Sequence, residues 1–155
     1  MEHLPQPIDK EFNELVLTMA QCLMPHGFEV ATDAPQTYEA LRDYYNETGK
    51  IKVWNGASEC TIFGYPVVNW AFRAWHDWVH VMNSLEFTVD DEHSVMRFQQ
   101  LQIIELLGNT AQAQRFCMYL EAEIDGQAEY FQKHGHFPED QRAFFNEYIA
   151  QRKAA

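Results

Sequence analysis

The chain has 155 residues and is acidic, with 23 Asp and Glu against 11 Lys and Arg and a formal net charge of −12. This balance disfavours binding to a phosphate backbone, which relies on clustered Lys and Arg, so direct nucleic-acid binding is not expected. A hydrophobic content of 46%, with 4 Trp, 7 Tyr and 11 Phe, argues against disorder and predicts one packed domain over residues 1–155.

The cysteine spacing and the hydropathy of the segments indicate the cellular compartment. Cys22, Cys60 and Cys117 lie far apart without C-x-x-C spacing, so neither a disulfide framework nor a cysteine zinc site is expected. No basic region followed by an apolar run opens the sequence, and no segment approaches the ~18 apolar residues of a membrane span. We therefore predict a cytoplasmic protein without a membrane partner.

Helical periodicity, punctuated by proline and glycine, predicts an all-α helical bundle of six helices. The expected helices are 8–24, 35–49, 66–83, 91–107, 109–135 and 138–153. Residues 50–65 are expected to form a turn-rich connection before the central helix, with one short extended piece at 60–63. The apolar face of the first helix carries no polar residue in this pattern, which indicates a purely structural role.

The polar residues of the central helix fall within one sector of roughly 120° on a helical wheel. A solvated face is usually rich in Lys and Glu, and this sector has neither. It contains instead Asn69, Arg73, His76, Asp77, His80 and Asn83. His76 and His80 are one turn apart, which is the i, i+4 spacing of helical zinc ligands. A polar stripe facing water is the alternative explanation.

Polar residues also interrupt the apolar faces of two later helices. Glu92 and Gln99 lie within the apolar arc of 91–107, and Glu123 and Gln127 lie within that of 109–135. Because a buried carboxylate needs a partner, these residues are expected to meet the histidines or to form a hydrogen-bond network in which Arg73 pairs with one glutamate.

The first of these options predicts a divalent metal site. His76, His80 and Glu123 are its expected ligands, and Glu92 is a further ligand or a catalytic carboxylate. Zn²⁺ is the favoured ion, with iron and manganese as alternatives. Second-shell side chains would orient the ligands, and the expected ones are Gln99, Gln127 and Arg73.

The segment His76-Asp77-Trp78-Val79-His80 resembles the H-E-x-x-H helix of zinc metalloproteases, with Asp77 at the place of the general base. His76-Asp77 is also similar to the His-Asp pair of the HD phosphohydrolase family, an all-helical metal fold. These resemblances imply a further ligand at Glu121 or Asp125. On a regular helix, however, both residues lie on the solvent face, opposite Glu123.

These observations predict a metal-dependent hydrolase in which Asp77 or Glu92 accepts a proton from metal-bound water. Its substrate, a small molecule or a peptide, is unidentified. One alternative is an acidic, non-catalytic protein that binds or inhibits a protein partner, with Trp54, Tyr44 or Tyr45 as interface anchors. A second alternative is a ferritin-like non-haem iron oxidase, which is disfavoured because the Glu-x-x-His repeats of that family are missing.

Overall fold

The fold was analysed in a computed structural model, which describes residues 5–154. It is mostly helical, as the sequence predicts. The chain forms two compact units, of which the first ends at Ser84 and the second begins at Leu85. The expectation that no leader opens the sequence concerns in part residues 1–4, which lie outside the described residues. A single domain over the whole chain stays a prediction.

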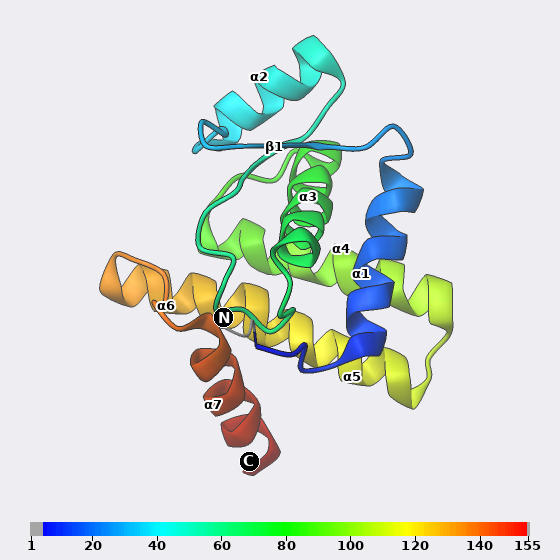
Figure 1. Cartoon of the computed structure of the whole chain (residues 1–155), viewed down its shortest axis with the longest axis vertical. Helices are drawn as coiled ribbons and strands as arrows, with labels where there is room; N and C mark the ends of the chain where they lie inside the picture. The colour runs from blue at the N-terminus through cyan, green and yellow to red at the C-terminus, as the bar shows by residue number, and fades with distance from the viewer. Residues whose placement is uncertain (1–4, 155) are drawn as a thin grey trace. The chain divides into compact units, whose positions relative to one another are not determined.

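The first unit combines three helices with a small parallel sheet (Figure 1). Its elements are α1 (Lys10–Leu23), β1 (Glu29–Ala31), α2 (Tyr38–Thr48), β2 (Lys52–Trp54) and α3 (Pro66–Asn83). Asp9 and Thr37 cap the first turns of α1 and α2 by accepting hydrogen bonds from backbone N–H groups. Pro66 occupies the first turn of α3, where its missing N–H costs nothing.

Helix α3 is the centre of this unit. It packs against α1, α2 and β2, and the side chain of Trp75 is fully buried. Phe63 from the connection before α3 stacks on Phe12 of α1 at 6.0 Å and on Phe72 of α3 at 5.2 Å. These aromatic contacts hold α1 and α3 together around the connection between them.

Two expectations for the first unit are wrong. The extended piece predicted at 60–63 is a series of bends and turns, and the strands lie instead at β1 and β2, where Val30 pairs with Val53. The face of α1 also includes a buried polar residue, Asn13, whose side-chain amide donates a 2.8 Å hydrogen bond to the carbonyl of Phe63. The carbonyl of Phe63 lies in a turn, and the amide of Asn13 supplies its hydrogen bond.

The second unit consists of helices only. Its elements are α4 (Val89–Leu107), α5 (Ala111–Leu120), the π-helical turn η1 (Glu121–Gly126), α6 (Gln127–His134) and α7 (Gln141–Ala154). Thr88 caps α4 and Thr110 caps α5. The segments α5, η1 and α6 form one continuous helical run, because the residues at both junctions keep helical backbone angles. This run is the predicted helix 109–135, and α4 packs along it (Figure 1).

The π-helical turn changes which side chains share a face. A π turn accommodates an extra residue, and one residue corresponds to about 100° of rotation on a helix. The apolar face predicted for a regular helix therefore holds as far as Ile124, which is buried, and fails at Phe131, which is 45% exposed. Phe131 packs instead against Phe137, with ring centroids 4.7 Å apart.

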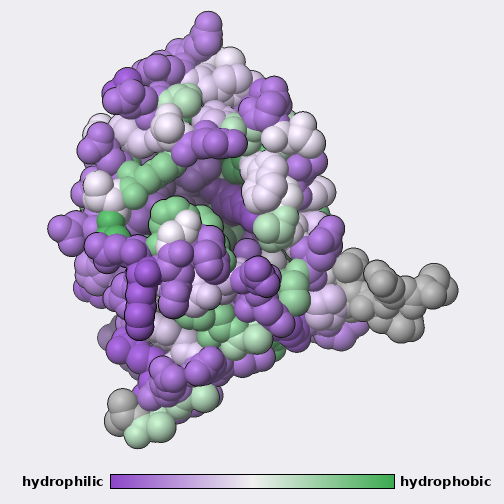
Figure 2. Space-filling model, turned by 90° about the vertical axis from the view of Figure 1, so that its left-hand side faces the viewer, coloured by the Kyte–Doolittle hydropathy of each residue, from purple (hydrophilic) through white to green (hydrophobic). Residues whose placement is uncertain are grey.

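The hydropathy of the helices tests the prediction that no segment spans a membrane. Within the described residues, no helix combines the length and the apolar character that a membrane crossing requires. On the face drawn in Figure 2, hydrophilic residues predominate and hydrophobic ones occur in small groups.

Candidate functional site

The two histidines of α3 meet at their ring tips. Nε2 of His76 and Nε2 of His80 are 3.1 Å apart, and the rings are nearly perpendicular at 81°. Zn²⁺ binds imidazole nitrogen at about 2.0–2.1 Å, so two such bonds at a tetrahedral angle would put the nitrogens about 3.4 Å apart. The pair is therefore within a few tenths of an ångström of the spacing that one ion needs.

Neighbouring residues fix the orientation of both rings. Phe72, one turn before His76, lies nearly parallel to its ring, at 16° and 6.4 Å. His80 is completely buried, and its backbone carbonyl accepts a hydrogen bond from Ser84, whose left-handed backbone ends the helix. Because buried and stacked rings have few rotamers, the pair is largely preorganised.

This geometry permits two chemical states. In the first, one imidazole donates its Nε2 proton to the other Nε2, which gives a neutral hydrogen-bonded pair. In the second, both Nε2 atoms are deprotonated and direct their lone pairs at a common metal ion. The His76–His80 pair can thus supply two ligands to a metal ion.

Two other polar residues of α3 hold the connection before it. The guanidinium of Arg73 donates hydrogen bonds to the carbonyls of Trp54 and Gly56, both at 2.6 Å, and of Ala57 at 3.3 Å. The buried amide of Asn69 donates to the hydroxyl of Ser58 at 2.9 Å. The polar sector that the sequence presents as one site is therefore divided, because two of its six residues anchor the loop.

Asp77 is half-buried on α3 and adjoins the pair in sequence. Its role as the proton acceptor stays a prediction.

In the second unit, the predicted inward-facing polar residues are largely buried. Glu123 is 8% exposed, and its Oε2 accepts a 3.2 Å hydrogen bond from the amide of Gln127. Gln99 is fully buried in α4, and Glu92 is half-buried in the first turn of α4. The helical wheels thus identified Glu123 and Gln99 as buried polar residues, and the ligand-orienting role of Gln127 stays a prediction.

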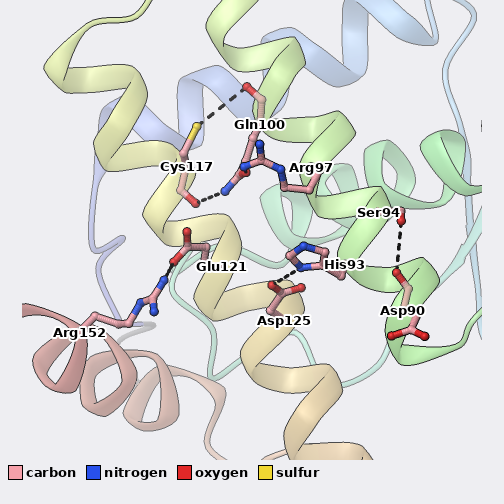
Figure 3. Close-up of polar contacts among 9 residues, drawn as sticks. All are labelled: Asp90, His93, Ser94, Arg97, Gln100, Cys117, Glu121, Asp125 and Arg152. Atoms are coloured by element: carbon pink, nitrogen blue, oxygen red, sulfur yellow. Dashed lines mark hydrogen bonds and ion pairs between the residues drawn. The ribbon is translucent and has the colours of Figure 1, made fainter. Parts of the chain in front are cut away.

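Asp125 departs from its predicted place on the solvent face. Its Oδ2 accepts a 2.8 Å hydrogen bond from Nδ1 of His93 in α4, and its side chain is 18% exposed (Figure 3). The pair lines a hollow of about 380 Å³ together with Val89, Asp90 and Glu129. The π-helical turn explains the difference, because it rotates Asp125 towards α4. Nothing in a single-sequence wheel signals such a turn.

Glu121 is also partly covered, at 28% side-chain exposure, because Arg152 of α7 binds it (Figure 3). The hydrogen bond from Arg152 to Glu121 raises the pKa of the guanidinium above its ordinary value. Glu121 thus ties α7 to η1, and the solvent-face prediction is wrong for this residue as well.

A third polar cluster links α4 to α5. Gln100 accepts a hydrogen bond from Arg97 at 2.8 Å and donates one at 3.0 Å to the carbonyl of Cys117 (Figure 3). Burial raises the pKa of the Cys117 thiol above its ordinary value of 9.0. The sequence missed Gln100, which looks like a surface residue in an alternating Gln-rich segment.

The described part of the chain thus holds a preorganised histidine pair in the first unit and, in the second, the buried carboxylate of Glu123 with the partly buried ones of Glu92, Glu121 and Asp125. Comparison with known proteins adds no further assignment: no family model, curated protein or solved structure matches the chain.

Proposed function

We propose that this chain is a metal-dependent hydrolase whose ion is held by His76 and His80. The observation that carries the proposal is the 3.1 Å separation of the two Nε2 atoms, one of them on a fully buried ring. One ion could bind the Nε2 lone pairs of both rings at once.

A carboxylate is proposed as the third ligand, and the candidates are Glu123 and Glu92, which the sequence places within apolar helix faces. Glu123 is buried and accepts a hydrogen bond from Gln127. Two imidazoles and one carboxylate with an open fourth position are a ligand set of catalytic zinc sites.

The proposed chemistry is hydrolysis by metal-bound water. A zinc ion lowers the pKa of bound water to about 7, so hydroxide is available near neutrality. Asp77 is the proposed proton acceptor, as its sequence position beside His76 suggests. A bound ion would supply the nucleophilic hydroxide for attack on an electrophilic carbon or phosphorus, and Asp77 would return the proton that it accepted to the leaving group.

The proposal is tested by elemental analysis and Zn²⁺ titration of the purified chain. We expect one tightly bound equivalent of Zn²⁺, iron or manganese in the wild type and no tightly bound metal in the His76→Ala/His80→Ala variant, with helicity retained. His26→Ala is the matched control, because His26 is exposed in the same unit. Stoichiometric metal in the double variant would contradict the proposal.

The first alternative is that the same ligands bind a redox-active iron ion in an oxidase. The absorption spectrum of the anaerobic, iron-loaded chain, recorded before and after oxygen is added, distinguishes the oxidase from the hydrolase. A new near-ultraviolet band after oxygen would favour the oxidase, and an unchanged spectrum together with zinc-dependent hydrolysis would favour the hydrolase.

A second candidate function is binding to a protein partner. The observation that favours it is the 51% exposure of Trp54, whose ring lies 5.6 Å from the Arg73 guanidinium and is therefore held in place. Rigid, exposed aromatic side chains are frequent interface anchors. A chain that contains no metal, and cannot be loaded with one, would favour this function over hydrolysis.

A further inference from the structure

A second pair of histidines lies on the surface of the other unit. His134 is the last residue of α6, Gly135 follows it in the left-handed conformation at φ 79°, and His136 comes next. Both imidazoles lie beside the ring of Tyr130, at 4.2 and 5.8 Å between centroids. The glycine therefore turns the chain back so that two histidines flank one aromatic ring.

The two rings can reach one ion. Their centroids are 6.2 Å apart. Two imidazoles bound to a common zinc ion at about 2.1 Å and at the tetrahedral angle have centroids about 5.3 Å apart. Rotation of either exposed side chain about its χ angles can shorten the distance by the remaining ångström.

A hydrogen bond at Nδ1 of His136 leaves its Nε2 atom available to bind a metal ion. Nδ1 of His136 donates a 2.9 Å hydrogen bond to the carbonyl of Phe137. In a neutral imidazole this places the proton on Nδ1 and leaves the Nε2 lone pair available, which is the arrangement that metal-bound histidines generally have. His134 lies at the carboxyl end of α6, where the helix dipole favours a positive charge.

We propose that His134 and His136 form a second, solvent-accessible site for a divalent transition-metal ion such as Zn²⁺. Water fills the remaining coordination positions. The exposure of both residues makes this a weak, rapidly exchanging site. The proposal does not depend on the metal centre proposed at His76 and His80, which lies in the other unit.

The test is Zn²⁺ titration of the full chain by calorimetry, with circular dichroism as the check of folding. We expect a weaker binding event in the wild type that is lost or reduced about tenfold or more in affinity in His134→Gln/His136→Gln. His26→Gln, another exposed histidine, should leave this event unchanged. A weaker event that survives the double variant, or is missing from the wild type, overturns the proposal.

Three further variants separate this site from the first one and from a general surface effect. His76→Gln/His80→Gln should keep the weaker event, so failure of the proposed hydrolase centre would leave the surface site standing. Gly135→Asn should retain binding because Asn adopts left-handed angles, whereas Gly135→Val should weaken it because a β-branched residue does so only with strain. Equal affinity in both would contradict the role of the turn.

Discussion

Asn13 is a single residue on which the packing of the first unit depends. Its amide satisfies the carbonyl of Phe63 inside the interface of α1 with the connection before α3. Side-chain amides in such places are costly to remove, because the partner stays buried. The wheel of α1 missed this residue, since its partner lies 50 positions away in sequence.

We predict that Asn13→Ala lowers the free energy of unfolding of the first unit by about 1–3 kcal/mol, the usual cost of leaving a buried polar group unsatisfied. All four tryptophans lie between residues 54 and 78, so tryptophan fluorescence in urea reports this unit alone. Asn46→Ala, at an exposed helix position, is the control, and we expect a change within about 0.5 kcal/mol. Equal effects of the two substitutions would contradict this account.

Cys117 provides a prediction with a defined pH window. Burial raises the pKa of its thiol in the folded chain above the ordinary 9.0, so the folded state holds this proton more tightly than the unfolded state. Its contribution to stability is therefore complete below pH 9.0 and decreases as the pH rises through the folded-state pKa. We expect iodoacetamide at pH about 8 to modify Cys117 more slowly than the exposed Cys22 and Cys60, as measured by peptide mass spectrometry.

At the scale of elements, the π-helical turn determines which residues of the second unit meet. It brings Asp125 to His93 and turns Phe131 out to solvent. It also ends at Gly126, where a Cβ atom would lie 3.0 Å from the ring of Tyr148 and 3.2 Å from that of Phe144 in α7. The close approach of α7 thus requires a residue without a side chain.

We predict that Gly126→Ala destabilises the second unit by about 1 kcal/mol. Overpacking lowers the free energy of unfolding by about 1–3 kcal/mol. The higher helix propensity of Ala offsets about 1 kcal/mol of this loss. Hydrogen exchange of peptides from residues 85–154 measures the effect. In a Tyr148→Ala background the same substitution should be neutral or stabilising, because the ring is gone. A destabilisation that persists there would rule out overpacking as the cause.

At the scale of the whole molecule, the proposed metal centre couples metal binding to folding. Binding to the folded state alone stabilises it by about 2.7 kcal/mol when free Zn²⁺ is about 100 times its Kd. We expect this stabilisation in urea unfolding followed by tryptophan fluorescence, which reports the unit that contains His76 and His80. His76→Ala/His80→Ala should remove the effect. An equal stabilisation of this variant by Zn²⁺ would contradict binding at the histidine pair.

The sequence by itself determined the helical class, the helix boundaries to within a few residues and the burial of Glu123 and Gln99. These properties follow from local rules, namely the period of 3.6 residues, the caps and the cost of burying polar groups. The i, i+4 spacing of His76 and His80 is likewise local, and their ring tips meet as that spacing predicts.

The tertiary structure alone decided the rest. The parallel pairing of β1 with β2, the attachment of Arg73 to the 54–57 loop and the hydrogen bond of Asn13 all depend on segments that are distant in sequence. The π-helical turn depends on packing, and it reversed the expectation for Asp125 by changing the helical phase after residue 120. A helical wheel assumes the same rotation for every residue. Where packing introduces a π turn, the wheel therefore assigns the following residues to the wrong face.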